Sequence, residues 1–440
     1  MEKRVCIIGV GPSGITALKN LVDEGLQVVA YDRNQEVGGN WIFTESESHS
    51  SVFETTHIIS SKTLSQYADF TFDDFDPSVP DYPSHRQLAA YFQAYARQFD
   101  LYRHIEFETE VLNAQRKPNG GWILKIRQQG IEREEEFSDL VVCNGHHWNP
   151  RMPQYPGSFS GQFLHSHQYK KAAPFAGQRV LVIGGGNSAC DVAVETSRVS
   201  AQTDISWRRG YRIIPKFVFG KPSDIVASRF SKLPMFLRRR MAELMIRVLV
   251  GKNSWHGLQD PENRFGATHP TINEELLYRV RHGKVNPRID IARLDGNTVH
   301  FKDGSQQDYD VIIACTGYII THPFFQEDFI NYREGPVPLY LKMLHPEYAD
   351  LFFIGLFQPL GCIWPGAELQ SKIMARQLAG KWQRPANIKT LVERELRNPH
   401  FEQIKTPRHT ITVDYHLFVK ELLRELPKDY IRKQRPAFAE

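Results

Sequence analysis

The stretch VCIIGVGPSG at residues 5–14 decides the fold of the N-terminal part of the chain. Its continuous apolar start predicts a strand that is covered on both faces, and a helical pattern follows the glycines directly. Glycines at this spacing allow a tight turn and the close approach of a pyrophosphate to the helix N-terminus. Asp32 ends the next apolar run, where a carboxylate can accept hydrogen bonds from ribose hydroxyls. We therefore predict a dinucleotide site here.

A second stretch, VLVIGGGNSA at residues 180–189, repeats this pattern with alanine at its last position. The strand predicted after it, at 204–206, leads to Arg208 and Arg209 instead of a carboxylate. A guanidinium can hold a 2′-phosphate that an acidic residue would repel, so the pattern favours NADP over NAD. A solvated charged surface is the alternative interpretation of these arginines. Two nucleotide sites on one chain further indicate that a reduced nicotinamide transfers electrons to a flavin.

Further apolar runs at 28–31, 140–143 and 311–314 complete a pattern of buried strands and helices. This pattern predicts an α/β fold with two Rossmann-like dinucleotide-binding domains, the second inserted in the first. The expected boundaries are 1–168 for the first part of the first dinucleotide-binding domain, 169–289 for the second, NADP-binding domain, and 290–440 for the second part of the first domain with a C-terminal helical tail.

Residues 217–251 do not follow the Rossmann pattern and are predicted to form a helical insertion. Apolar residues recur in this segment at helical spacing, namely Leu237, Met241, Leu244, Met245, Val248 and Leu249. Such a stripe usually covers a protein core, and this is our expectation. The arginines at 238–240 leave a membrane-surface helix as the alternative, although we do not expect a membrane partner.

Composition and charge narrow the classes of partner. The 440 residues carry a formal net charge of +4, which is too small to indicate nucleic-acid binding. The five cysteines lie far apart without a C-x-x-C pair, which argues against a disulfide framework, a zinc site and a dithiol redox motif. We therefore expect no bound metal and a reducing, cytoplasmic location.

Residues 159–169, between the two glycine-rich units, read FSGQFLHSHQY. This stretch matches F-x-G-x-x-x-H-x-x-x-[YF], and the sequence resembles the flavin-containing monooxygenase family of class B flavoprotein monooxygenases. The similar segments are GGNW at 38–41, VCNGHH at 142–147, ACTGY at 314–318 and GLFQPLG at 355–361. The resemblance extends over residues 1–380.

The resemblance implies FAD at the first unit and NADPH at the second. The residues that it places around FAD are Gly9, Gly11, Ser13, Gly14, Asp32, Asn40, Trp41, His49 and Gln358. The residues that it places around NADP are Tyr169, Gly184, Gly186, Ser188, Ala189 and Arg208, with Arg209 and Arg376 as weaker candidates. Ordinary aromatic packing is the alternative interpretation of Trp41 and Tyr169. Family members often form dimers, so a homodimer is one candidate assembly, but the sequence leaves the oligomeric state open.

The activity implied by the resemblance is that of a monooxygenase which forms a C4a-hydroperoxide on the reduced flavin. Its partners would be dioxygen and a small-molecule amine or sulfide, with an N-oxide or S-oxide as product. Baeyer–Villiger oxygenation and amine N-hydroxylation are the enzymatic alternatives, and a dinucleotide-sensing regulatory protein is the alternative without turnover. A disulfide reductase would need a cysteine pair beside the flavin, which the sequence lacks.

One position departs from the family pattern. Alignment of residues 51–62 places Ile59 where the family usually has an asparagine close to the reactive face of the flavin. Either the neighbouring Ser60 supplies the missing hydrogen bond, or more hydrogen peroxide is released. Ile59 and Ser60 are therefore candidate residues near that face.

Overall fold

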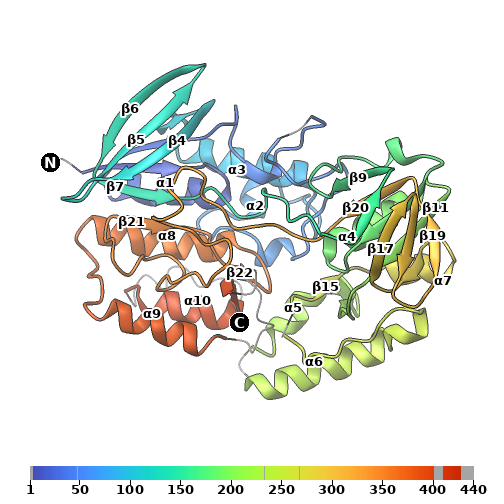
Figure 1. Ribbon diagram of the computed structural model, residues 1–440. Coiled ribbons are helices and arrows are strands. Elements are labelled where there is room, and N and C mark those ends of the chain that lie inside the picture. Colours follow the sequence, from blue (N-terminus) through green and yellow to red (C-terminus); the bar gives the residue numbers. More distant parts are fainter. Residues whose placement is uncertain (1–2, 47, 232, 267, 401–409, 428–440) are drawn as a thin grey trace.

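Two five-stranded sheets, in which all paired strands are parallel, form the framework of the protein (Figure 1). The computed structural model describes residues 3–46, 48–231, 233–266, 268–400 and 410–427. The first sheet has the order β21-β7-β1-β2-β3. Its strands are β1 (Arg4–Ile8), β2 (Gln27–Tyr31), β3 (Ile105–Glu106), β7 (Asp139–Val142) and β21 (Leu351–Phe353).

The second sheet repeats this arrangement with the order β9-β20-β10-β11-β16. Its strands are β9 (Gln162–His165), β10 (Arg179–Ile183), β11 (Gln202–Ser206), β16 (Asn286–Arg288) and β20 (Val311–Ala314). Strands β10 and β11 correspond to β1 and β2, so the predicted α/β fold with two Rossmann-like units is confirmed. Strands β9 and β20 lie outside the range 169–289 expected for the second domain, so its sheet starts earlier and ends later than those boundaries.

One helix follows the central strand of each sheet. Helix α1 (Pro12–Asp23) starts directly after the first glycine turn and buries Ile15, Leu18 and Leu21. It ends next to Gly25, whose φ of +76° is a backbone conformation that glycine adopts at little cost. Helix α4 (Asn187–Thr196) follows β10 in the same way, and α8 (Trp364–Leu378) packs against α1.

Successive residues of β1 point into different cores. Val5 and Ile7 pack in the core that includes α1 and α8, whereas Cys6 and Ile8 pack in the core on the other face of the sheet. A strand that is buried on both faces favours apolar residues at successive positions. This preference explains the continuous run from which the sheet was predicted.

The remaining elements surround these two units. The other helices are α2 (Phe72–Phe75), α3 (His85–Gln98), α7 (Glu275–Arg281), α9 (Ile388–Arg397) and α10 (Tyr415–Arg424). An antiparallel sheet contains β4 (Thr109–Arg116), β5 (Trp122–Gln128) and β6 (Ile131–Phe137). A further sheet contains β8 (Gly157–Phe159), β17 (Ile291–Gly296), β18 (Thr298–Phe301) and β19 (Gln306–Asp308). Short strand pairs are β12 (Ile213–Ile214) with β15 (Thr271–Ile272), and β22 (Gln358–Pro359) with β23 (Thr412–Val413).

The predicted insertion consists of the hairpin β13 (Phe217–Val218) and β14 (Lys221–Pro222), followed by α5 (Ser223–Ser228) and α6 (Met235–Leu249). The expectation that its helical stripe covers a core is wrong, because none of the described residues of α6 is buried. The period of the stripe was correct, but the helix turns that stripe away from the protein.

Three further findings concern the partners and bound groups that the sequence analysis considered. Within the described ranges, no helix has both the length and the apolar character needed to cross a bilayer. The five cysteines are free, and four of them are buried. No cluster of three metal-ligating side chains occurs among the residues that the structure describes.

Candidate functional site

The first glycine turn is held by close backbone contacts. The Gly9 N–H donates to the Tyr31 carbonyl oxygen over 2.8 Å, and a Cβ at Gly9 would lie 2.8 Å from the Cys143 carbonyl oxygen. A Cβ at Gly14 would lie 1.9 Å from the Gly9 carbonyl oxygen. Both positions therefore exclude a side chain, as a turn between a buried strand and a tightly packed helix requires.

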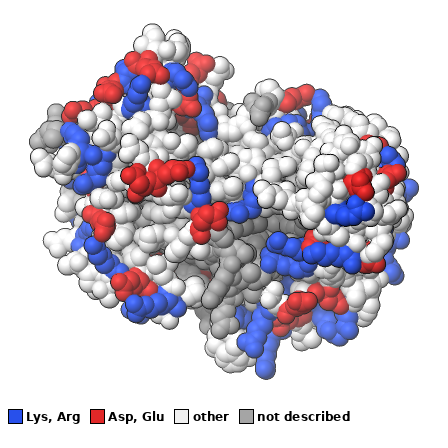
Figure 2. Space-filling model, viewed as in Figure 1, with Lys and Arg blue, Asp and Glu red and all other residues white. Residues whose placement is uncertain are grey.

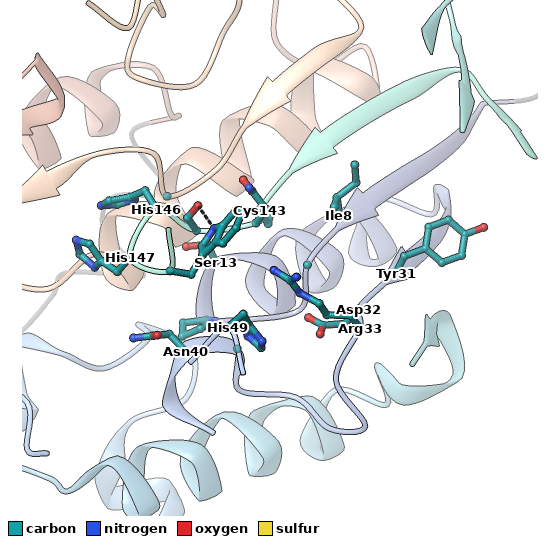
Figure 3. A pocket seen from close by; sticks show the side chains of 18 of the residues that line it. Ile8, Ser13, Tyr31, Asp32, Arg33, Asn40, His49, Cys143, His146 and His147 are labelled. Carbon is teal, nitrogen blue, oxygen red and sulfur yellow. Dashed lines mark hydrogen bonds between the residues drawn. The ribbon is translucent and has the colours of Figure 1, made fainter. Parts of the chain in front are cut away.

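A cavity of about 230 Å³ opens at this turn (Figure 3). We call it the first cavity. The residues expected around FAD that line it are Gly9, Gly11, Ser13, Asp32, Asn40, Trp41 and His49. Figure 3 shows Asp32 and Arg33 at one end and His146 and His147 at the other. The cavity is therefore elongated along the path that an extended dinucleotide would take.

Asp32 is held rigidly at one end of the first cavity. Its carboxylate accepts the N–H groups of Val10 over 2.7 Å and of Asn34 over 2.8 Å. Burial raises the pKa of Asp32, and these two hydrogen bonds only partly oppose that shift. Each carboxylate oxygen retains a further lone pair that can accept a ribose hydroxyl.

His49 lies between the two ends of the first cavity and contacts Asn34, with 3.3 Å between Nε2 and the amide nitrogen. Burial, together with the positive charge of Arg33, lowers the pKa of His49 to about 4. The ring is therefore neutral at pH 7. It can take part in hydrogen bonds but adds no positive charge beside a phosphate.

The second glycine turn has the same construction. The Gly184 N–H donates to the Ser206 carbonyl oxygen over 3.0 Å, and a Cβ at Gly184 would lie 2.6 Å from the Cys315 carbonyl oxygen. Ala189 occupies the packing position that Gly14 has in the first unit. A Cβ added at Gly184 would also lie 3.4 Å from the Cβ of Ala189. Around Gly186, by contrast, a Cβ would meet no atom of the described structure within 4 Å. This open position faces the space where a pyrophosphate would approach α4.

The backbone register corrects one detail of the NADP prediction. Because Tyr31 and Ser206 accept the equivalent N–H groups, Asp32 of the first unit corresponds to Trp207 of the second. Trp207 is fully buried. The carboxylate is therefore absent, as expected, but Arg208 lies one residue beyond its position.

The two candidate arginines differ in their surroundings. Arg208 is exposed, whereas Arg209 is half-buried and stands 5.7 Å from the centre of the Tyr211 ring. Tyr211 itself packs on Gly185, where a Cβ would be 2.2 Å from the ring. Tyr211 thus links Arg209 to the second glycine turn.

A second cavity of about 220 Å³ lies where the two units meet, and we call it the junction cavity. It contains Gly186 and Ser188 from the second turn and Gln358 and Ile59 from the first unit. His146 and His147 line both cavities. None of the described residues that line the junction cavity is a carboxylate, which favours a negatively charged or neutral occupant.

Three residues predicted to lie near a cofactor line neither cavity. Tyr169 is buried and packs against Phe53 and Phe175, which agrees with ordinary aromatic packing. Arg376 lies in the last turn of α8 and donates to the Lys381 carbonyl oxygen, so the structure does not bring it to the second unit. The Ser60 hydroxyl lies 2.7 Å from that of Ser65 inside the protein.

Trp41 lines the first cavity and also contacts Trp364 edge to face, with 5.8 Å between the ring centres. Gly14, Gly184, Ala189, Arg208 and Arg209 support or flank the two turns without lining either cavity. The positions of Gly14, Gly184 and Ala189 agree with the packing roles of such residues in dinucleotide-binding turns.

His146, His147 and Tyr318 were not named as site residues from the sequence. All three line the junction cavity, and the rings of His147 and Tyr318 are 5.8 Å apart. They follow the carboxyl ends of β7 and β20. A signal was present, because ligands of parallel sheets bind outside those strand ends.

The residues present fit two dinucleotides. A Cβ at Gly39 would lie 2.8 Å from the Gly11 Cα, so the two backbones form a narrow cradle at the N-terminus of α1. Neither α1 nor α4 has a side-chain cap at its N-terminus, which leaves backbone N–H groups for phosphate oxygens.

Comparison with known proteins agrees with this geometry. The family model described as Flavin-binding monooxygenase-like matches residues 2–429. The chain is 32% identical to the rat protein named Dimethylaniline monooxygenase [N-oxide-forming] 2, over 97% of this chain and 83% of the relative.

Two solved structures share the fold. One is S-allyl-L-cysteine S-oxygenase from Allium sativum, with a TM-score of 0.71, 22% identity and coverage of 100% of this chain and 95% of that chain. The other is cyclohexanone monooxygenase from Rhodococcus sp. Phi1 bound to NADP+, with a TM-score of 0.65, 16% identity and coverage of 90% and 89%. With its two Rossmann-type units, the chain is a flavin-dependent monooxygenase that uses FAD and NADPH, and it belongs to the flavin-binding monooxygenase-like family.

Proposed function

We propose that the enzyme oxygenates soft nucleophiles, converting tertiary amines to N-oxides and thioethers to S-oxides. The observation that carries this proposal is the meeting of the two cavities at His146 and His147. There the nicotinamide end of one dinucleotide can approach the flavin end of the other. The name of the rat relative, an N-oxide-forming dimethylaniline monooxygenase, supports an amine substrate.

We assign distinct tasks to the residues of the two cavities. Gly9, Gly11 and Ser13 position the FAD pyrophosphate, while Asp32 accepts the ribose hydroxyls. Gly186 and Ser188 position the pyrophosphate of NADP at the N-terminus of α4. Bound FAD supplies the redox chemistry that activates dioxygen, which side chains lack.

The junction cavity would hold the substrate. Ile59, Ile320 and Ile411 give its lining apolar surface that excludes water from the reacting centre. Gln358 contacts His146, with 3.4 Å between the amide oxygen and Nε2, and this contact orients one polar edge of the cavity.

Product analysis tests the proposal. FAD-loaded protein should consume NADPH and dioxygen in equal amounts with trimethylamine or methyl phenyl sulfide, and mass spectrometry should find the N-oxide or S-oxide. Cyclohexanone, ornithine and lysine serve as comparison substrates. Turnover of only the ketone or only the amino acids would favour the two enzymatic alternatives, and NADPH binding without oxygen consumption would favour a sensor.

Arg208→Ala tests the selectivity for NADPH. We expect its KM for NADPH to rise about tenfold or more, because a hydrogen bond to a charged group is worth about 1.5–3 kcal/mol. The KM for NADH should stay nearly unchanged, since NADH lacks the 2′-phosphate. Initial rates with both nucleotides measure the effect, and Arg376→Ala on α8 is the control that should alter neither value. Equal losses for NADPH and NADH would contradict the assignment.

Ile59→Asn tests the departure from the family pattern. Ile59 lines the junction cavity, and an amide there can donate a hydrogen bond worth about 1 kcal/mol, so peroxide release per NADPH should fall about fivefold. A peroxidase-coupled assay beside NADPH consumption gives this ratio. Ile59→Leu, which restores no donor, should behave as the parent enzyme, and equal ratios in the two variants would show that residue 59 does not face the reacting oxygen.

A further inference from the structure

Arg33 is the only lysine or arginine among the described residues that line the first cavity. It follows Asp32 just beyond the carboxyl end of β2. Figure 3 shows its side chain beside Asp32, with the nitrogen atoms directed toward the interior of the cavity. The diphosphate of FAD is doubly negative, and a guanidinium binds phosphate oxygens through charge-assisted hydrogen bonds. The charge of Arg33 therefore matches this group of the cofactor.

The surroundings of Arg33 leave its guanidinium available for a ligand. Among the described residues, no carboxylate forms an ion pair with Arg33. Glu110, which also lines the first cavity, pairs instead with Arg127 over 2.5 Å. His49 is neutral at pH 7, because burial and the charge of Arg33 lower its pKa to about 4. Arg33 is thus positively charged, and neither of these two neighbours takes its place.

Trp148 holds the Arg33 side chain in position. The guanidinium carbon lies over the indole ring, 5.3 Å from the ring centre, which is a cation–π contact. The turn that carries Trp148 is itself anchored. Its Nε1 donates to the Gly145 carbonyl oxygen over 3.2 Å, and the Asn144 amide donates to the Thr321 carbonyl oxygen over 3.0 Å. The ring therefore restricts a long side chain that would otherwise sample many rotamers.

Arg33 and Trp148 lie at a boundary between two spaces. Both line the first cavity, and both also line a third cavity of about 690 Å³, which we call the outer cavity. The outer cavity reaches the surface at Met152, which is 45% exposed, and at Gln168, which is also exposed. Water and ions that enter from this side therefore meet Arg33 and Trp148 before they reach the first cavity.

Surface charges are less suited to hold the diphosphate. The net charge of the chain is only +4, and Figure 2 shows basic and acidic side chains next to one another over most of the face that it displays. Charges of opposite sign at such distances largely cancel, and salt screens them beyond about 10 Å. A guanidinium inside the cavity acts on the cofactor at shorter range.

We propose that Arg33 is an FAD-binding residue that retains the cofactor through its diphosphate, and that Trp148 is the positioning residue that keeps the Arg33 guanidinium at the first cavity. Backbone N–H groups at the start of α1 would supply hydrogen bonds to the same diphosphate, whereas Arg33 adds the opposite charge. The proposal rests on the place of FAD in the first cavity, but it does not depend on the proposed substrates.

The rate at which the FAD-loaded protein releases its cofactor tests the role of Arg33. The protein is diluted into buffer without FAD, and the fluorescence of the flavin that passes an ultrafiltration membrane is followed over time. At low salt, Arg33→Gln should release FAD about tenfold faster or more, because charge-assisted hydrogen bonds are lost. Arg33→Lys keeps the charge but not the planar fork, so its release rate should lie between those of Arg33→Gln and the parent.

Arg394→Gln is the matched control. Arg394 is exposed on α9 and lines none of the three cavities, so this variant loses the same charge away from the cofactor. It should release FAD as the parent does.

Salt distinguishes an electrostatic role from a structural one. Raising NaCl from about 0.05 M to 0.5 M should speed FAD release from the parent several-fold and from Arg33→Gln much less, because added ions screen the charge of Arg33. Trp148→Ala should speed release by about threefold to tenfold at low salt. Trp148→Phe keeps an aromatic face and should stay close to the parent.

Each of these comparisons can overturn the proposal. Arg33→Gln releasing FAD at the parent rate, at the Arg394→Gln rate or with the salt dependence of the parent would remove Arg33 from the diphosphate. Equal rates for Trp148→Ala and Trp148→Phe would remove the positioning role of the indole ring. If Gly11→Ala also kept FAD as the parent does, the first cavity itself would not hold the cofactor. Weak FAD binding by Gly11→Ala beside unchanged release from Arg33→Gln would reject the role of Arg33 alone.

Discussion

Replacing Gly11 by Ala is expected to give a protein that folds but does not retain FAD. The backbone at Gly11 has φ −67° and ψ −173°, which any residue adopts, and a Cβ there would lie 3.5 Å from the Gly39 Cα at ordinary contact distance. Gly11 and Gly39 both line the first cavity at the N-terminus of α1. The added methyl group would occupy the cradle where the pyrophosphate must approach the backbone.

Crowding of this kind costs roughly 1–3 kcal/mol, which predicts roughly tenfold to a hundredfold weaker FAD binding. Titration of the apoprotein with FAD, followed by flavin absorbance, measures the change. Gly335→Ala is a suitable control, because its Cβ would meet nothing within 4 Å among the described atoms and Gly335 lines neither cavity. If the Gly11→Ala protein bound FAD as tightly as the parent does, the pyrophosphate would not bind in this cradle.

Gly186→Ala is expected to weaken NADPH binding without affecting FAD binding. Gly186 has φ −82° and ψ 178°, and its Cβ would meet no protein atom of the described structure within 4 Å, so the fold accepts the methyl group. Gly186 lines the junction cavity where NADP would approach α4. We expect the variant to keep its FAD and its yellow colour, while the KM for NADPH rises by roughly tenfold to a hundredfold.

Reduction of the flavin by dithionite is the control for the Gly186→Ala variant. This small reductant needs no nucleotide site, so the flavin should be reduced as in the parent protein. A normal KM for NADPH would place the nicotinamide dinucleotide elsewhere, and a loss of FAD would mean that the two sites are not separate.

Most of the sheet framework was predictable, because its signals are local. Apolar runs at 5–8, 28–31 and 180–183 correspond to β1, β2 and β10 within one residue, since strands covered on both faces favour continuous apolar runs. The glycine turns were equally predictable, because the carbonyl oxygens close to Gly9 and Gly184 leave no room for a Cβ at either position.

Features that depend on distant partners could not be predicted. The helical period located the stripe on α6 but not its direction, because that direction follows from the bonds of Arg238 to Asp414 and of Glu243 to Arg212. The inward turn of Ser60 similarly depends on Ser65. The equivalence of Asp32 and Trp207 required the hydrogen-bond register of both sheets.

The repeated strand order of the two sheets has an evolutionary consequence. Each half carries its own glycine turn and its own residues after the second strand, Asp32 in one and Trp207 to Arg209 in the other. Descendants of such a duplicated plan can alter the coenzyme preference of one copy by a few substitutions while the other copy keeps its prosthetic group. A lineage could thus shift between phosphorylated and unphosphorylated nicotinamide donors without rebuilding its oxidative centre.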